Sequence, residues 1–499
     1  MQALIQPHIF NGTVTIPASK SHTIRRLLLA SLTQGVSRIE RPLDSLDAQS
    51  CAAACRVLGA EIIEERDGGS RLSCWIVRGH RPGNGGGTAE FSGGKGLRID
   101  VGNSGTTLFL ALAAAALNSV PVTFSGDSQI ARRSAGPLLD ALTGLGISVT
   151  SSRGADGKPG YTPITICGPW KGGRVSISCP TSQYLSALLI AAPLAPAGTI
   201  TEIDVPMLNE RPYVEMTLSY LKSQGLYGDG TLQSNGVSIN DGMPLDGGTA
   251  LTAAADFSCF HIRGGSSYMP MNGPVPGDFS SAAFPAAAAA ISKGTVTLLG
   301  LDPNDTQGDK VFFDYLEQMG CDVCWERINN TKMHPISAGS TTDKHGGCAQ
   351  WQVTVSRTGP LKGGVFDLNA TPDMLPVMTV LGAFAEGTTS LVNAAHARIK
   401  ETDRIAVMAA ELRKLFSGSA GFRCEEKPDG LLIHGCCSAG TNNEPQSEMP
   451  AVMLDGHDDH RIVMALACAA LGGTAPVMIN GAEAADVTYP GFLDLLNGK

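Results

Sequence analysis

The sequence is poor in charged and aromatic residues, which make up 17% and 5% of its 499 residues. No basic run is present and the net charge is −9, which argues against nucleic acid as the main partner. No apolar run approaches the length of a membrane span, and even the run at 108–122 is interrupted by polar residues and Pro121. The first residues lack the basic start and apolar core of a signal peptide. We therefore expect a cytoplasmic protein with neither a membrane nor a nucleic acid as partner, and we expect a monomer.

Several chemical motifs are also missing. The sequence contains no HExxH pair, no Walker A loop, no Rossmann GxGxxG unit with its acidic residue and no GxSxG elbow. The 13 cysteines are odd in number and scattered, which suits reduced thiols better than a disulfide framework. Cys321 and Cys324 form a CxxC pair, but no second CxxC accompanies it, so core packing is favoured over zinc.

What the sequence does contain is one pattern repeated six times. An Ala- and Leu-rich run ends at a short turn, and in several copies a β-branched strand follows directly. In most copies a second, amphipathic helix comes next, as at 137–146, 214–225 and 404–415. The first helix is apolar on all sides and should be buried, whereas the second has a polar face. The six runs are 25–35, 108–120, 184–198, 282–294, 378–387 and 462–473.

The pattern predicts six α/β units, arranged as two domains of three units each, in a chain too long for one core. Additional Gly-, Ser-, Thr- and Asn-rich stretches at 228–256, 325–350 and 436–451 interrupt the units and predict surface loops. We assign no function to these loops.

Polar residues precede or begin each buried helix. Ser, Thr and Asp at these positions are expected as N-caps, but capping does not explain Lys20, Arg25, Gln183 and Arg461 on helices that are otherwise buried. The positive end of a helix dipole favours anions, so the helix starts predict anion binding. The six segments are 19–23, 102–106, 181–183, 277–281, 371–374 and 457–461.

Metal binding is a weaker interpretation of one of these segments. His457 and His460 flank two aspartates, but a metal site usually needs a further ligand and a defined geometry. Such clusters also serve as helix caps and anion sites, and we expect no metal here.

Six segments together resemble one known family, the enolpyruvyltransferases. They are PASKSHTIRRLLLASL, GNSGTT, TSQYLSALLIAAPLA, GDFSSAAF, RIKETDRIAVMAAELRKL and DDHRIVMAL, and the resemblance runs from about Ile16 to Leu496. It implies an α/β fold of two domains, each an inside-out α/β barrel with three βαβαββ repeats. The N-terminal strand would belong with the C-terminal half. The implied domains are residues 1–17 with 276–499, and residues 18–275 with an insertion near 228–256.

The resemblance also implies an activity. The carboxyvinyl group of phosphoenolpyruvate is transferred to the 5-hydroxyl of shikimate 3-phosphate, phosphate is released, and no metal or cofactor takes part. This reaction lies on the pathway to chorismate and the aromatic amino acids. Two alternatives stay open: an enolpyruvyltransferase with a different acceptor, and a descendant of the fold that binds ligands without catalysis.

The resemblance assigns roles to individual residues. Lys20 would contact both substrates and assist proton transfer, Asp373 would be the base for the acceptor hydroxyl, Glu401 would exchange the proton of the methylene carbon, and His460 would support them. The residues implied for shikimate 3-phosphate are Lys20, Ser21, Arg25, Thr181, Ser182, Gln183, Asp373, His396 and Lys400. Those implied for phosphoenolpyruvate are Lys20, Gly105, Arg133, Gln183, Arg404 and Arg461.

Four positions depart from the family pattern. An Arg that usually follows the GNSGT loop is Phe109, and a Lys that usually lies near the C-terminus is Val487. An acceptor-site Asn is His396. A Ser that touches the acceptor's phosphate is Glu210, whose charge would repel a phosphate unless the side chain turns away.

Overall fold

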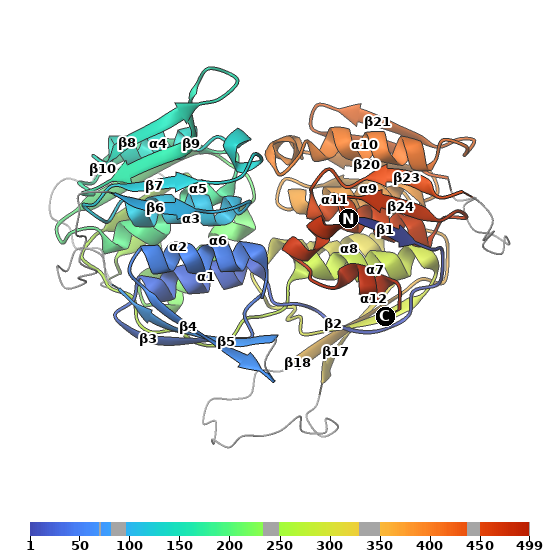
Figure 1. The fold of residues 1–499 in the computed structure, drawn as a ribbon, viewed down its shortest axis with the longest axis horizontal. Coiled ribbons are helices and arrows are strands. Elements are labelled where there is room, and N and C mark those ends of the chain that lie inside the picture. The colour runs from blue at the N-terminus through green and yellow to red at the C-terminus, as the bar shows by residue number, and fades with distance from the viewer. Residues whose placement is uncertain (69–70, 81–95, 233–248, 329–349, 437–449, 499) are drawn as a thin grey trace. The chain divides into compact units, whose positions relative to one another are not determined.

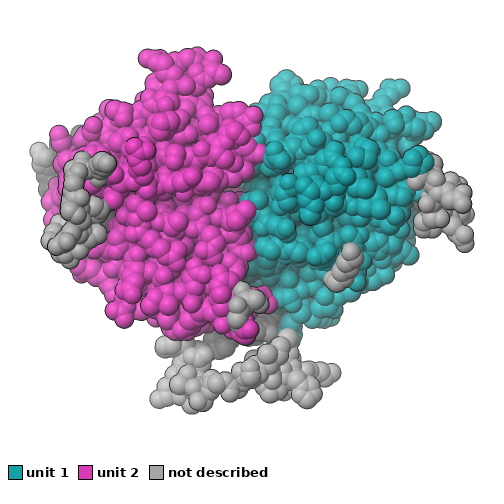
Figure 2. All heavy atoms as spheres, viewed as in Figure 1, with its two compact units in different colours: residues 1–19, 276–499 teal, residues 20–275 magenta. Residues whose placement is uncertain are grey.

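The computed structural model describes residues 1–68, 71–80, 96–232, 249–328, 350–436 and 450–498. The chain divides into two compact units, coloured separately in Figure 2. Unit 1 contains Met1–Ser19 and Pro276–Lys499, and unit 2 contains Lys20–Val275. The first residues of the chain therefore belong with its C-terminal half.

Unit 2 contains both strands and helices along its whole length (Figure 1). Its strands are β3 (Gly35–Glu40), β4 (Glu61–Asp67), β5 (Arg71–Gly79), β6 (Leu97–Asp100), β7 (Val122–Ser125), β8 (Ser148–Arg153), β9 (Pro159–Cys167), β10 (Gly173–Cys179), β11 (Ile200–Leu208), β12 (Tyr227–Leu232), β13 (Leu251–Ala254), β14 (Cys259–Arg263) and β15 (Asn272–Pro274). Its helices are α1 (Lys20–Ser31), α2 (Leu46–Val57), α3 (Gly105–Ala115), α4 (Gly136–Gly144), α5 (Ser182–Ala191) and α6 (Arg211–Ser223), with short 3₁₀ turns η1 (Ile130–Arg132) and η2 (Ala192–Leu194).

Unit 1 is built in the same way. Its strands are β1 (Gln2–Ile5), β2 (Gly12–Thr15), β16 (Thr295–Leu299), β17 (Asp322–Ile328), β18 (Gln350–Ser356), β19 (Val365–Asp367), β20 (Thr388–Val392), β21 (Arg423–Lys427), β22 (Gly430–His434), β23 (Val452–Asp455) and β24 (Val477–Asn480). Its helices are α7 (Phe279–Ser292), α8 (Val311–Gln318), α9 (Leu375–Ala383), α10 (Arg404–Leu415), α11 (His460–Leu471) and α12 (Phe492–Leu496), with 3₁₀ turns η3 (Gly308–Lys310), η4 (Pro372–Met374), η5 (Ala395–Ile399) and η6 (Ala482–Val487).

The described strands form six sheets, three in each unit, in agreement with the six predicted repeats. Each sheet contains a parallel pair of strands followed by at least one antiparallel strand. Four sheets share one order: β15-β3-β5-β4, β6-β7-β9-β8, β2-β16-β18-β17 and β19-β20-β22-β21. The remaining two are β10-β11-β14-β13-β12 and β23-β24-β1.

The parallel strand pairs determine where the polar segments before the helices lie. Parallel strands need a crossover connection, and in four repeats a buried helix makes it: α3, α5, α9 and α11. Since both strands of a pair end at the same edge, the segments that follow them lie close together. Thus Cys179 at the end of β10 is in register with Leu208 at the end of β11. The residues that start α5 and those that precede α6 are therefore neighbours.

The prediction that the first helix of each repeat is buried is confirmed in full for four helices, since every residue of α3, α7, α9 and α11 is buried. In α1, 9 of 12 residues are buried, and in α5, 9 of 10. The second helices α2, α6 and α10 bury one face only. Alanine favours the helical conformation and is small, so Ala-rich helices form readily and pack closely.

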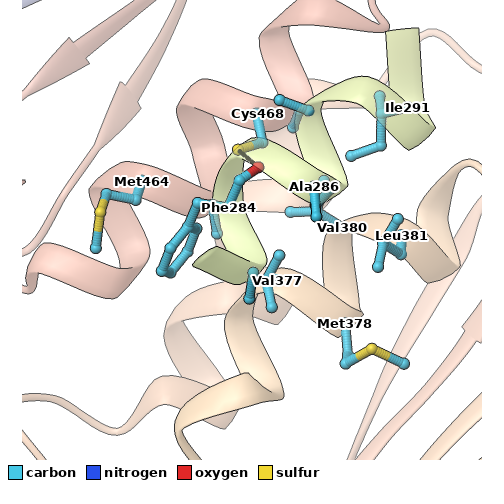
Figure 3. Packing of buried hydrophobic residues seen from close by; sticks show 14 of the residues in the cluster. Phe284, Ala286, Ile291, Val377, Met378, Val380, Leu381, Met464 and Cys468 are labelled. Carbon is cyan, nitrogen blue, oxygen red and sulfur yellow. Dashed lines mark hydrogen bonds between the residues drawn. The ribbon is translucent and has the colours of Figure 1, made fainter. Parts of the chain in front are cut away.

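The core of unit 1 illustrates this packing. Helices α7, α9 and α11 contact one another, and Figure 3 shows Phe284, Val377 and Cys468 among the side chains between them. The Cys468 thiol donates to the carbonyl oxygen of Phe284 at 3.3 Å, so the two helices approach closely.

Parts of the predicted surface loops lie outside the described residues, namely 233–248, 329–349 and 437–449. The described ends of the first loop form β12 and β13, which pair in parallel. Among the helices that the structure describes, none is long and apolar enough to cross a membrane.

Candidate active site

The predicted site residues divide between the two units. Unit 1 contains Asp373, His396, Lys400, Glu401, Arg404, His460 and Arg461. Unit 2 contains Lys20, Ser21, Arg25, Gly105, Arg133, Thr181, Ser182 and Gln183. We describe each group within its own unit.

In unit 1 the polar residues follow strands β19, β20 and β23. Asp373 lies on η4 directly before α9, Arg404 is the first residue of α10, and Arg461 is the second residue of α11. Two of these helices have aspartate N-caps: Asp403 accepts from Ala406 N at 3.0 Å, and Asp459 accepts from Arg461 N at 2.9 Å. Capping thus fixes where α10 and α11 begin, with Arg404 and Arg461 in their first turns.

Arg404 is the centre of this cluster, which we call the arginine cluster (Asp373, Glu401, Arg404, Asp459 and Arg461). Its side chain has no exposed surface. Nη1 donates to Asp373 Oδ1 at 2.8 Å, Nη2 to Glu401 Oε2 at 2.6 Å, and Nε to Asp459 Oδ2 at 2.8 Å. Burial alone lowers the pKa of Arg404, but the charges of Asp459, Glu401 and Asp373 outweigh burial and raise that pKa. The guanidinium therefore stays charged and holds three carboxylates in place.

Asp373 lies between two guanidinium groups. Its Oδ1 accepts from Arg404 and its Oδ2 accepts from Arg461 Nη2 at 2.7 Å, while Lys400 Nζ is 4.0 Å from Oδ1. Burial favours the neutral acid, yet the charges of Arg461, Lys400 and Arg404 hold the pKa of Asp373 well below its usual range. The carboxylate is thus ionised, and its side chain is 22% exposed, so a ligand can reach it.

Two acids, Asp459 in the cluster and Asp309 outside it, were not assigned a role from the sequence. Asp459 is fully buried and also accepts from the hydroxyl of Thr402 at 3.1 Å. Asp309 on η3 is fully buried and accepts a short hydrogen bond from the hydroxyl of Ser280. Burial, and next the charge of Asp373, raise the pKa of Asp309 to about 6. The only sequence signal for Asp459 is its place before the first residue of a buried helix, and Asp309 gives none.

The two predicted histidines of unit 1 are both buried. His460 begins α11, and its Nδ1 is 4.0 Å from Asp459 Oδ1. His396 lies on η5, four residues before Lys400. His457, by contrast, has a side chain that is 37% exposed and whose Nε2 is 3.0 Å from Oε1 of Glu411. Among the residues that the structure describes, no group of three or more His, Cys, Asp or Glu side chains is placed to hold a metal ion.

In unit 2 the GNSGT loop and Arg133 lie together. The loop follows β6 and Arg133 follows β7, its parallel partner. A Cβ atom on Gly105 would lie 2.0 Å from Nη1 of Arg133, so only glycine lets the guanidinium approach so closely. Gln183 Nε2 donates to the hydroxyl of Thr106 at 3.0 Å and brings the start of α5 to the start of α3. These groups offer N–H donors and one positive charge, which suits a phosphate.

Phe109 lies one turn further along α3. It is buried and meets the ring of Tyr184 edge to face, with centroids 5.0 Å apart. The Tyr184 hydroxyl donates to the carbonyl oxygen of Ser134, next to Arg133. An apolar contact therefore stands at the position where the family usually has an Arg.

The start of α5 binds a carboxylate of the chain itself. Oε2 of Glu210 accepts from the Thr181 hydroxyl, the Ser182 backbone N–H and the Ser182 hydroxyl, each at 3.0 Å. The Glu210 side chain thus turns toward the two residues predicted for the acceptor's phosphate.

The remaining predicted residues of unit 2 belong to α1. Arg25 is buried; its Nε donates to the hydroxyl of Thr217 at 2.9 Å, and its Nη1 donates to the carbonyl oxygen of Ser21 at 3.3 Å. Burial lowers the pKa of Arg25 to about 10 against the opposing charges of Tyr220, Tyr213 and Glu210. Lys20 Nζ is 3.1 Å from Oδ2 of Asp47, an ion-pair partner that the sequence did not reveal.

Comparison with known proteins identifies a family model and relatives that match this chain. The sequence model of EPSP synthase (3-phosphoshikimate 1-carboxyvinyltransferase) matches residues 5–247 and 246–496. A 3-phosphoshikimate 1-carboxyvinyltransferase of Acetivibrio thermocellus is 40% identical over 98% of this chain and 95% of its own length. One of Ruminiclostridium cellulolyticum is 37% identical over 98% of this chain and 96% of its own length.

Solved structures show the same fold. An EPSP synthase structure from Acinetobacter baumannii superposes with a TM-score of 0.69 and covers 100% of this chain and 98% of its own, at 24% identity. A second structure of an EPSP synthase from that organism gives a TM-score of 0.69 at 23% identity. The predicted family is confirmed by the match along nearly the whole sequence. The chain belongs to the EPSP synthase (3-phosphoshikimate 1-carboxyvinyltransferase) family.

Proposed function

We propose that this protein transfers the carboxyvinyl group of phosphoenolpyruvate to the 5-hydroxyl of shikimate 3-phosphate and releases phosphate. The observation that carries this proposal is Asp373 between Arg404 and Arg461, with Lys400 nearby. A carboxylate among three cations can take a proton from a hydroxyl while the same cations hold anionic substrates.

Addition moves two protons. The acceptor hydroxyl gives its proton to Asp373 as its oxygen bonds to C2 of phosphoenolpyruvate, and Glu401, which first takes a proton from solvent, gives that proton to C3. In the elimination C3 returns a proton to Glu401, the bond from C2 to the phosphate oxygen breaks, the double bond forms again, and Asp373 gives its proton to the departing phosphate. Lys20 and His460 assist these transfers, and neither a metal nor a cofactor is required.

The arginine cluster also explains how a strongly acidic Asp373 becomes a base. A carboxylate is a poor base while its pKa lies well below its usual range. We assign the carboxylate of phosphoenolpyruvate to Arg404 and Arg461, the residues whose charges lower this pKa. A bound carboxylate shares their charge and raises the pKa of Asp373, so the base gains strength when the donor substrate is present.

We assign the other roles as the family resemblance implies them. Gly105, Arg133 and Gln183 bind the phosphate of phosphoenolpyruvate. Thr181 and Ser182 are assigned to the phosphate of the acceptor, as is Lys400, and Gln183 and His396 are assigned to further acceptor contacts. Ser21 and Arg25 bind the carboxylate of shikimate.

A second candidate function is the same transfer to an acceptor without a phosphate. The observation that favours it is Glu210, whose carboxylate already accepts hydrogen bonds from the hydroxyls of Thr181 and Ser182.

Turnover distinguishes the candidates. Purified protein is incubated with phosphoenolpyruvate and either shikimate 3-phosphate or shikimate, and phosphate release and the enol ether product are followed. We expect product with shikimate 3-phosphate. Product with shikimate alone would favour the second candidate, and binding of both substrates without product would favour a non-catalytic protein.

Asp373→Ala tests the assignment of the base. We expect turnover to fall by about 10²- to 10⁴-fold, the usual contribution of a general base. Asp494→Ala, an exposed aspartate on α12, is the matched control and should leave turnover unchanged. An Asp373→Ala variant with the native rate would remove this residue from the mechanism.

A further inference from the structure

The start of α5 is an anion site that is already filled. Three donors converge on one carboxylate oxygen of Glu210: the hydroxyls of Thr181 and Ser182 and the backbone N–H of Ser182. Exposed N–H groups at the start of a helix favour an anion, and α5 is a buried helix of ten residues. Glu210 is itself only 3% exposed, so these donors take the place of water around its carboxylate.

Helix capping does not account for Glu210. The N-cap of α5 is Thr181, whose hydroxyl accepts from Gln183 N at 3.5 Å. Glu210 comes from a different part of the chain, directly before α6, and is brought to this helix by the parallel pair β10 and β11. Its backbone has φ 56° and ψ 38°, a left-handed conformation that is uncommon for residues other than glycine. This uncommon backbone conformation occurs at the residue whose carboxylate accepts all three hydrogen bonds.

A buried cation contacts the first turn of α6, next to Glu210. Arg25 is 1% exposed and its Nη2 donates to the carbonyl oxygen of Tyr213 at 3.2 Å. Burial lowers the pKa of Arg25, whereas the charges of Tyr220, Tyr213 and Glu210, in that order of size, oppose this shift. The nearest polar atoms that Arg25 contacts are neutral oxygens of Thr217, Tyr213 and Ser21. Glu210 therefore supplies negative charge to a region where a buried guanidinium and a helix start both attract it.

We propose that Glu210 is a resident anion that the phosphate of the acceptor must displace, so that this residue sets affinity and selectivity for the phosphorylated acceptor. The proposal rests on the proposed function, which assigns Thr181 and Ser182 to that phosphate. A phosphate accepts the same hydrogen bonds and carries equal or greater negative charge, so it can replace the carboxylate. Both anions cannot occupy the donors together.

Charge removal is the first test. Glu210→Gln keeps the shape of the side chain, and Glu210→Ser removes most of it. In both variants we expect the KM for shikimate 3-phosphate to fall about tenfold to a hundredfold, the equivalent of a charge-assisted hydrogen bond. The KM for phosphoenolpyruvate should stay within about twofold, since its phosphate is assigned to other residues. Glu215→Gln, which changes an exposed glutamate on α6, is the matched control and should change neither constant.

Binding without turnover separates this proposal from the proposed function. Calorimetric titration with shikimate 3-phosphate should show tighter binding to Glu210→Gln than to the native protein, whereas titration with shikimate should not. Tighter binding of both acceptors alike would overturn the proposal. If the native protein binds shikimate 3-phosphate but does not turn it over, the proposed function fails while this comparison still decides the role of Glu210.

The native protein offers a test that does not depend on a variant folding. A crystal structure with shikimate 3-phosphate should show the Glu210 carboxylate more than hydrogen-bond distance from Thr181 and Ser182, with the phosphate in its place. A complex in which Glu210 keeps all three hydrogen bonds would overturn the proposal. So would a KM for shikimate 3-phosphate that is unchanged or raised in both variants while kcat and thermal stability remain native.

Discussion

Two repeats of the molecule use the same strand pairing to hold a carboxylate, and they do so with different donors. In unit 1, Asp373 follows β19 and accepts from two guanidinium groups that follow β20 and β23. In unit 2, Glu210 follows β11 and accepts from two hydroxyls and one backbone N–H that follow β10. The topology brings the polar segments together, and the residue types decide what each can do.

The two arrangements differ in how a ligand could enter. In the arginine cluster, the cations carry permanent charge and can share it with an additional carboxylate, so Asp373 need not leave. At the start of α5, the donors are few and neutral and all meet one oxygen, so a second anion must replace the first. A ligand of the arginine cluster therefore changes the pKa of Asp373, whereas a ligand at the start of α5 competes with Glu210 for the same donors.

The largest effect should come from removing the central cation of unit 1. In Arg404→Met, three carboxylates lose their shared partner inside the protein, so we expect the free energy of unfolding to fall by about 3–5 kcal/mol. Turnover should be lost as well, because Asp373 and Glu401 are no longer positioned. Urea unfolding and the phosphate-release assay measure the two effects.

Two companion variants make this test specific. Arg413→Met removes an arginine at the exposed end of the same helix, whose guanidinium donates to the carbonyl oxygen of Cys424, and should change stability by about 1 kcal/mol. Arg404→Lys keeps the charge but lacks the forked geometry, so it should retain part of the stability and little of the activity. A native urea midpoint in Arg404→Met would mean that the cluster does not depend on this cation.

The sequence predicted the helix starts well because their signals are local. A capping residue, an apolar run and a turn occupy consecutive positions in the sequence, and they coincide with the buried helices α3, α7 and α11. The partners of the site residues were harder to find because they come from other elements. Asp47 reaches Lys20 from α2, and Asp459 reaches Arg404 across 55 residues. Nothing in their own neighbourhood marks these acids as partners.

Glu210 shows a second limit of sequence reasoning. Its position against the family pattern identified a conflict of charge at the acceptor's phosphate. Whether the side chain would turn away or toward Thr181 depends on the left-handed backbone at Glu210 and on the register of β10 and β11. Both are properties of the folded chain, so the direction of the carboxylate came only from the structure.

A smaller effect concerns pH. One buried acid of unit 1 differs from Asp373, because burial and the charge of Asp373 raise the pKa of Asp309 from 3.8 to about 6. The folded protein holds this proton more tightly than the unfolded chain, so the contribution to stability is present at low pH and lost as pH rises through about 6. A shift of about two pKa units corresponds to a loss of about 3 kcal/mol between pH 4 and pH 8.

Asp309→Asn isolates this contribution, because an amide resembles the protonated acid and can still accept from Ser280. The melting temperature of the variant minus that of the native protein should therefore increase from pH 5 to pH 8. Asp314→Asn, an exposed aspartate in the neighbouring helix α8, serves as the control. A difference that stays constant with pH would show that Asp309 does not hold a proton in the folded state.

The smallest effect should come from Gly105→Ala in unit 2. The added Cβ would lie 2.0 Å from Arg133 Nη1, so the guanidinium must move away from the start of α3. We expect the KM for phosphoenolpyruvate to rise about tenfold to a hundredfold, equivalent to about 1.4–2.7 kcal/mol, because its phosphate loses one charge-assisted contact. Arg133 has a flexible side chain, so the fold should tolerate the change.

Gly418→Ala is the matched control, since a Cβ there would meet nothing within 4 Å. The KM for shikimate 3-phosphate should stay near its native value in Gly105→Ala, because the start of α5 retains Thr181 and Ser182. A parallel rise in both constants would mean that the phosphate sites at α3 and α5 are one site, linked through the hydrogen bond from Gln183 to Thr106. A rise for phosphoenolpyruvate alone would establish that unit 2 separates the two anions by helix, one at each start.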